Sequence, residues 1–137
     1  MASGILITAI SSGSGKTAAA CALMAAYQAQ NKKVSSCKCG PDYIDPMFHK
    51  EVLGVDSKNL DLFFSSEDEL RKEYAKHAAD AELVITEGVM GYYDGMRLDS
   101  VTASSYDVAR TLDIPAVLIL PCKGAALSLC AVVSGIV

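Results

Sequence analysis

The fold is decided by the stretch Ser11-Ser12-Gly13-Ser14-Gly15-Lys16-Thr17. An apolar run over 5–10 precedes it, and an alanine-rich stretch of helix-forming residues follows it. This order of strand, glycine-rich turn and helix is the context that a phosphate-binding loop requires. Gly13 and Gly15 let the backbone turn tightly and approach an anion, and the N–H groups then converge at the positive end of the following helix. The sequence therefore predicts a site for a nucleoside triphosphate.

The side chains of this loop suit the same ligand. Lys16 supplies a mobile positive charge for the β- and γ-phosphates, and the hydroxyl of Thr17 is a ligand for Mg²⁺. The full pattern G-x-x-x-x-G-K-[ST] has its first glycine at position 10, where this chain has Ile10, so an ordinary strand–helix turn is the competing interpretation. The expected nucleotide-binding residues are Gly13, Ser14, Gly15, Lys16 and Thr17.

Composition limits the class of protein. The chain has 137 residues, of which 51% are hydrophobic, and this length suits one domain with its own core. Its net charge of −4 gives no electrostatic reason to expect nucleic acid or an anionic membrane as partner. We expect a cytoplasmic protein, since no run is long enough to span a membrane and the N-terminus lacks a basic leader. The five cysteines are scattered, and Cys37-x-Cys39 lacks the further ligands of a zinc site, so reduced thiols are expected.

Strand-like and helix-like segments alternate along the chain. This alternation predicts an α/β fold of three layers, with a mostly parallel, doubly wound sheet. The segment 39–46 holds two prolines and a glycine, so we expect a loop there. The last stretch ends without a C-cap or a polar tail, so we expect the natural chain to continue beyond Val137. Expected strands cover 5–10, 34–38, 83–86 and 116–120, and expected helices cover 16–31, 66–79, 104–112 and 124–137.

Polar groups follow three of the predicted strands. The carboxyl ends of parallel strands meet at one edge of a sheet, so the phosphate loop, 38–45 and 87–94 should converge there. Asp45 and Glu87 would then join Thr17 as ligands of Mg²⁺, which takes one or two protein carboxylates, while Lys38 would add positive charge. The competing interpretation is that Asp42 and Asp45 only cap the loop after the second predicted strand, and that Glu87 is a surface acid. His49 and His77 have no partner in the pattern that points to catalysis or metal binding, and we expect both to be structural or exposed.

The sequence holds four motifs: Gly13–Thr17, Lys38–His49 (KCGPDYIDPMFH), Asn59–Asp61 (NLD) and Glu87–Gly95 (EGVMGYYDG). Together they resemble the cobyrinate a,c-diamide synthases. This resemblance implies a P-loop NTPase fold of the dethiobiotin-synthetase-like branch, ATP and Mg²⁺ as cofactors, and a C-terminal glutamine amidotransferase domain that is not among these 137 residues. Members of that family often carry glycine–threonine where this chain has Ala9-Ile10.

The resemblance also implies a reaction. The γ-phosphoryl group of ATP would pass to the a and c carboxylates of the corrinoid cobyrinate, and ammonia from glutamine would displace phosphate from each acyl phosphate. This amidation is a step of cobalamin biosynthesis. Lys38 would bridge the γ-phosphate and the substrate carboxylate, so the implied catalytic residues are Lys38, Asp45, Glu87 and Asp94. The implied substrate-binding residues are Asp42, Tyr43 and Asp94, which would orient the corrinoid or support the metal site.

Other classes stay open at this point. A partner-regulated ATPase of the chromosome-partitioning or division-site type would carry an extra lysine five residues before Lys16, where this chain has Ser11. A dethiobiotin-synthetase-like ligase fits the fold, but the loops 40–46 and 88–95 suit it poorly, and a non-catalytic nucleotide-binding module is a further alternative. The pattern leaves open whether the substrate is cobyrinate, hydrogenobyrinate or a nickel tetrapyrrole, and whether the protein is a homodimer.

Overall fold

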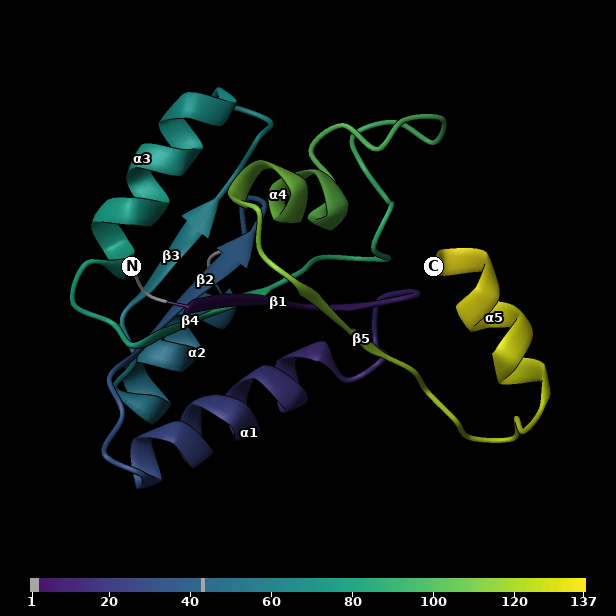
Figure 1. Ribbon diagram of the computed structural model, residues 1–137, viewed down its shortest axis with the longest axis horizontal. Helices are drawn as coiled ribbons and strands as arrows, with labels where there is room; N and C mark the ends of the chain where they lie inside the picture. Colours follow the sequence, from purple (N-terminus) through teal and green to yellow (C-terminus); the bar gives the residue numbers. More distant parts are fainter. Residues whose placement is uncertain (1–2, 43) are drawn as a thin grey trace.

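Strands and helices alternate along the whole chain (Figure 1). The computed structural model describes residues 3–42 and 44–137. The strands are β1 (Ser3–Ala9), β2 (Val34–Cys39), β3 (Ser57–Leu60), β4 (Leu83–Glu87) and β5 (Ala116–Ile119). The helices are α1 (Lys16–Ala29), α2 (Ile44–Leu53), α3 (Glu67–Ala78), α4 (Ser105–Leu112) and α5 (Ser128–Ile136).

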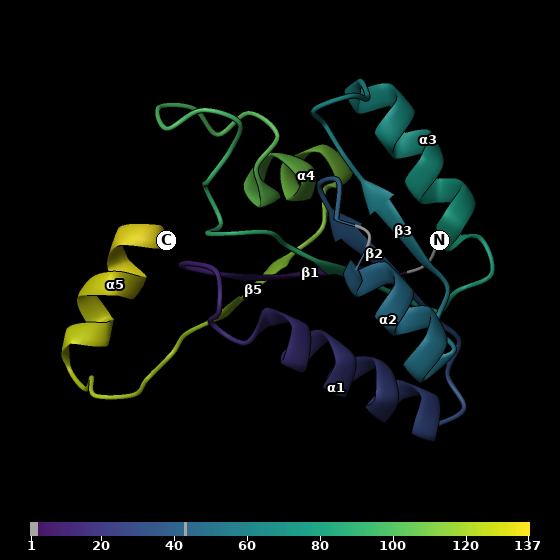
Figure 2. The ribbon, with the colours of Figure 1, turned by 180° about the vertical axis from the view of Figure 1, so that it is seen from behind.

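The five strands form one parallel sheet in the order β3-β2-β4-β1-β5. Figures 1 and 2 show α1 and α2 on one face of this sheet and α3 and α4 on the other. The predicted three-layer, doubly wound α/β fold is confirmed. All the strands run the same way, so the loop after β1, the loop after β2 and the loop after β4 leave the sheet at a single edge.

Two hydrophobic clusters hold the layers together. Side chains alternate between the faces of a strand, so neighbouring residues of β1 enter different clusters. Leu6 packs with Leu70 and Tyr74 of α3, whereas Ile7 packs with Ala20 and Met24 of α1. All six side chains are 9% exposed or less, so both helices are fixed against the sheet.

The helix α3 follows the sequence pattern closely. Ser66 and Glu69 form the expected reciprocal capping box, and Leu70, Tyr74 and Ala78 make up the buried face. This cap satisfies N–H groups that the first turn leaves without partners. The helix supports the sheet on the face opposite α1.

The segment after β2 differs from its prediction. A loop was expected over 39–46, but α2 begins at Ile44 and has Pro46 in its first turn. Proline fits there because its fixed φ is helical and the first turn has no intrahelical partner for an N–H. The strand β3 was also not predicted, because Ser57-Lys58-Asn59-Leu60 is short and polar, and it pairs in register with the end of β2.

The C-terminal elements are less covered than the rest. The helix α5 has no buried residue, and Figure 1 shows it apart from the sheet beyond β5. Within 3–42 and 44–137, no helix has the length and apolar character needed to cross a membrane.

Candidate functional site

The loop between β1 and α1 has the backbone of a phosphate-binding loop. Gly13 and Gly15 have φ values of 75° and 100°, in the left-handed region that disfavours residues with a side chain. Gly15 is also the N-cap residue of α1, so the N–H groups of the first helical turn face the loop. Ser14 contacts Ser11 within the loop, its Oγ lying 3.2 Å from the Oγ of that residue.

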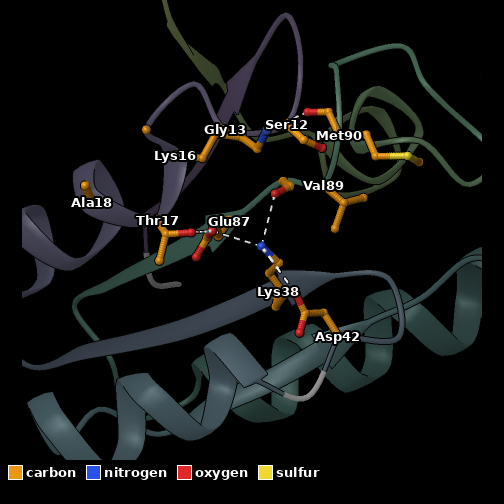
Figure 3. A pocket seen from close by; sticks show the side chains of 12 residues that line it. Ser12, Gly13, Lys16, Thr17, Ala18, Lys38, Asp42, Glu87, Val89 and Met90 are labelled. Atoms are coloured by element: carbon orange, nitrogen blue, oxygen red, sulfur yellow. Dashed lines mark hydrogen bonds and ion pairs between the residues drawn. The ribbon is translucent and has the colours of Figure 1, made fainter.

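This loop forms one wall of a cavity of about 590 Å³. The opposite walls come from the ends of β2 and β4 and from the loop that follows β4 (Figure 3). The predicted convergence of three strand ends is therefore observed. The lining residues are Ser12, Gly13, Gly15, Lys16, Thr17, Ala18, Lys38, Asp42, Glu87, Gly88, Val89 and Met90.

Glu87 is the last residue of β4 and is only 1% exposed. The hydroxyl of Thr17 donates to its Oε1 over 2.5 Å, and the ammonium of Lys38 donates to the same oxygen over 2.9 Å. Figure 3 shows the three side chains in a row across the cavity. Burial raises the pKa of Glu87, but the nearby His49 ring, the hydrogen bonds from Thr17 and Lys38 and the positive charge of Lys38 outweigh it and hold this pKa well below its usual range. Glu87 is therefore a carboxylate at neutral pH and not a surface acid.

Lys38 joins two of the three predicted catalytic carboxylates, Asp45 and Glu87. It lies opposite Glu87 in the register of β2 and β4, and its ammonium also donates to Asp45 Oδ2 over 2.7 Å. Asp42 Oδ2 is farther away, at 3.9 Å. Burial lowers the pKa of Lys38, but the hydrogen bonds to Asp45 and Glu87 outweigh this and raise it overall. The lysine is thus a permanent cation at the cavity wall.

Lys16 connects two loops. Its ammonium donates to the backbone carbonyl of Ser11 over 3.0 Å and to that of Met90 over 2.6 Å. Burial, and next the positive charge of Lys38, lower the pKa of Lys16. The negative charge of a bound phosphate would stabilise the ammonium of Lys16 and raise its pKa again, so this position suits an anion.

The predicted substrate-binding residues are only partly brought together. Asp42 lines the cavity, and its Oδ1 accepts a hydrogen bond from the Ile44 N–H over 2.9 Å, so the capping interpretation holds for that oxygen. Asp94 is exposed and outside the cavity wall, and its Oδ2 accepts from the N–H of Gly91 over 2.8 Å. In this structure Asp94 shapes the loop after β4 instead of facing the cavity. Tyr43 lies outside the described residues.

Two residues of the site have contacts that sequence reasoning missed. His49 was expected to have no functional partner, but its ring is fully buried and its Nε2 lies 3.4 Å from Glu87 Oε2. Asn59 holds the loop after β2, because its amide donates to the backbone carbonyls of Gly40 and Asp42 over 2.7 and 2.5 Å. Both residues lie in the quoted motifs, but their partners are distant in the sequence and could not be read from spacing.

The oxygen atoms near the loop fit a magnesium ion. Thr17 Oγ1 and Glu87 Oε1 are 2.5 Å apart, and Mg²⁺ prefers such oxygen ligands, with only one or two protein carboxylates. Among the described residues there is no cluster of three or more His, Cys, Asp or Glu side chains suited to a metal. A metal shared between protein and nucleotide does not need such a cluster.

Comparisons with known proteins agree with this geometry. Residues 5–120 match the family model CbiA, described as the CobQ/CobB/MinD/ParA nucleotide binding domain. The chain is similar to proteins named cobyrinate a,c-diamide synthase: 41% identical to that of Synechococcus sp. over 96% of this chain, 40% to that of Clostridium tetani over 97%, and 43% to that of Gloeobacter violaceus over 96%. It spans 29%, 30% and 29% of these three relatives.

Proposed function

Because this chain belongs to the family of CobQ/CobB/MinD/ParA nucleotide-binding domains, we propose that it is the ATP-binding part of a cobyrinate a,c-diamide synthase. In this proposal the domain activates the a and c carboxylates of cobyrinate for amidation. The observation that carries the proposal is the row formed by Thr17, Glu87, Lys38 and Asp45 beside the phosphate loop. The relatives that bear this name support the substrate.

In this proposal the phosphate loop and the row of side chains beside it have distinct roles. The backbone of 13–17 and the ammonium of Lys16 bind the phosphates of ATP. Thr17 and Glu87, with Asp45, hold Mg²⁺, which neutralises charge on the phosphoryl group when it is bound. Lys38 can leave Asp45 and place its ammonium between the γ-phosphate and the substrate carboxylate, because it is already at the cavity wall.

The chemistry needs activation because a carboxylate has no good leaving group. One carboxylate oxygen attacks the γ-phosphorus, the bond from this phosphorus to the β,γ-bridging oxygen breaks, and ADP leaves. Ammonia then attacks the acyl carbon, phosphate departs, and one proton is released as the amide forms. The protein contributes positioning and positive charge, which dominate catalysis of phosphoryl transfer.

We assign the other predicted residues to substrate handling. Asp42, at the cavity rim, and Tyr43 orient the corrinoid, and Asp94 sets the shape of the loop that faces it. Residues 1–137 form one ATP-binding domain. We propose that the remainder of the full-length protein includes the glutamine amidotransferase domain that supplies ammonia, because the relatives are about three times as long as this chain.

The test is steady-state turnover of the full-length protein with ATP, Mg²⁺, glutamine and cobyrinate. Glu87→Gln and Asp45→Asn should each lower kcat by about 100-fold or more while changing the affinity for ATP much less, because the metal acts on the transferring phosphoryl group. The matched control is Glu82→Gln, an exposed acid whose partners are Lys32 and Lys33. ATP hydrolysis that proceeds equally fast without cobyrinate would refute the proposal and favour the partner-regulated ATPase.

A further inference from the structure

His49 is a fully buried histidine beside the reaction site. It lies on α2, and its ring contacts side chains of β2, β3 and β4. Its Nδ1 is 3.1 Å from Ser36 Oγ and 3.4 Å from Ser57 Oγ. Its Nε2 is 3.4 Å from Glu87 Oε2. The imidazole thus connects two strands to the carboxylate at the end of a third.

His49 Nε2 and Glu87 Oε2 face each other and are both buried. Among the described residues, neither His49 Nε2 nor Glu87 Oε2 has a hydrogen-bond partner of good geometry, and both are buried. Buried polar atoms are almost always paired, so each atom is the partner that the other needs. An ionised carboxylate only accepts, which means that Nε2 must carry the proton. A small tightening of the contact would complete the bond, as happens in many sites when ligands bind.

The serines determine how the ring is held. Ser36 of β2 and Ser57 of β3 are register partners, so their hydroxyls flank the same side of the ring. With the Nε2 proton directed at Glu87, Nδ1 can accept a hydrogen bond from the hydroxyl of Ser36. The sheet therefore fixes both the orientation of the ring and the nitrogen that faces Glu87.

We infer that His49 is a positioning residue, which holds Oε2 of Glu87 so that Oε1 faces Thr17 and the phosphate site. This inference rests on the proposed role of Glu87 at the metal. The last torsion of a glutamate side chain is soft, so hydrogen bonds to Oε1 alone do not fix the plane of the carboxylate. A donor on the second oxygen does fix it. Outer partners of this kind usually contribute about 10- to 100-fold in activity or metal affinity.

Two substitutions at position 49 separate positioning from simple packing. His49→Gln puts an amide nitrogen near the place of Nε2 and can still donate to Glu87. His49→Asn puts its amide near the place of Nδ1 and cannot reach. In the full-length protein we expect His49→Asn to lower kcat by about 10- to 100-fold with little change in KM for ATP, and His49→Gln to lose at most about threefold. The control is His77→Asn, which removes a ring that contacts the backbone carbonyl of Ser36 from α3.

A second readout does not use turnover. Calorimetry with Mn²⁺ in the presence of a non-hydrolysable ATP analogue should show weaker metal binding for His49→Asn than for His49→Gln. Selective ¹⁵N labelling of histidine in the wild-type protein should show a proton on Nε2 of His49. If His49→Asn fails to fold, Ser36→Ala takes its place and should lower kcat in the same direction by a smaller factor.

The outcomes are distinct. Equal losses in His49→Asn and His49→Gln, or an unprotonated Nε2, would overturn the positioning role while leaving the proposed function intact. Full turnover in Glu87→Gln would overturn the proposed metal site and this inference with it. The inference is supported if kcat falls in His49→Asn but not in His49→Gln, and if Mn²⁺ binds more weakly to His49→Asn than to His49→Gln.

Discussion

Lys38→Met would leave two carboxylates without the cation that lies between them. Glu87 is 1% exposed and Lys38 is 4% exposed, and their charged atoms are 2.9 Å apart. Removing one member of a buried pair strands the other, which costs about 3–5 kcal/mol of unfolding free energy. Glu87→Gln keeps an acceptor for Thr17 and leaves Lys38 its bond to Asp45, so it should cost about 1.5–3 kcal/mol.

The double variant Lys38→Met/Glu87→Gln measures the energetic coupling between the two residues. Once Lys38 is methionine, a neutral glutamine at position 87 is less costly than a stranded carboxylate. The double variant should therefore be less destabilised than the sum of the single variants, by about 2 kcal/mol, within the range for residues in direct contact. For a domain of this size the loss in Lys38→Met corresponds to a fall in Tm of roughly 10–20 °C.

The assay is urea unfolding at pH 7, followed by circular dichroism. The control is Lys32→Met, because Lys32 and Glu82 form an ion pair that is about half exposed, and exposed pairs contribute little. This control should unfold like the wild type. Additivity of the two substitutions within about 0.5 kcal/mol would show that Lys38 and Glu87 are not energetically coupled and would refute the reasoning.

Three further predictions concern the phosphate loop, the pH and the fold. Lys16→Ala should weaken ATP binding by about 1.5–3 kcal/mol because a charge-assisted contact is lost, and equal calorimetric affinities would contradict this. The pKa of Glu87 is lower in the folded protein than its ordinary value of 4.5, so its ionised form stabilises the fold above pH 4.5. This contribution is lost as the pH falls toward the pKa of the folded state. The difference in unfolding free energy between wild type and Glu87→Gln should therefore shrink from pH 6 to pH 3 in urea unfolding. Ser66→Ala removes a helix cap and should cost about 1 kcal/mol, measured in the same assay, with unchanged ATP affinity in calorimetry.

The sequence by itself determined the features whose chemistry is local. The glycines of 13–17 predict a loop that only they can form, and Ser66 with Glu69 predicts a helix start, because backbone geometry and capping depend on neighbours in the chain. The alternation of apolar and helical segments was sufficient for the class of fold. Glu87 could be placed at the edge of the sheet because it directly follows an apolar strand.

Only the tertiary structure decided which side chains meet. The register of β2 and β4 puts Lys38 opposite Glu87, and that register comes from packing of both faces of the sheet. The strand β3 exists because β2 offers it an edge, since its own polar sequence carries no strand signal. His49 reaches Glu87 only after α2 docks on β2 and β3, which are separate in sequence from β4. Contacts between distant segments depend on the assembled sheet, so local spacing could indicate the residues of this site but not their partners.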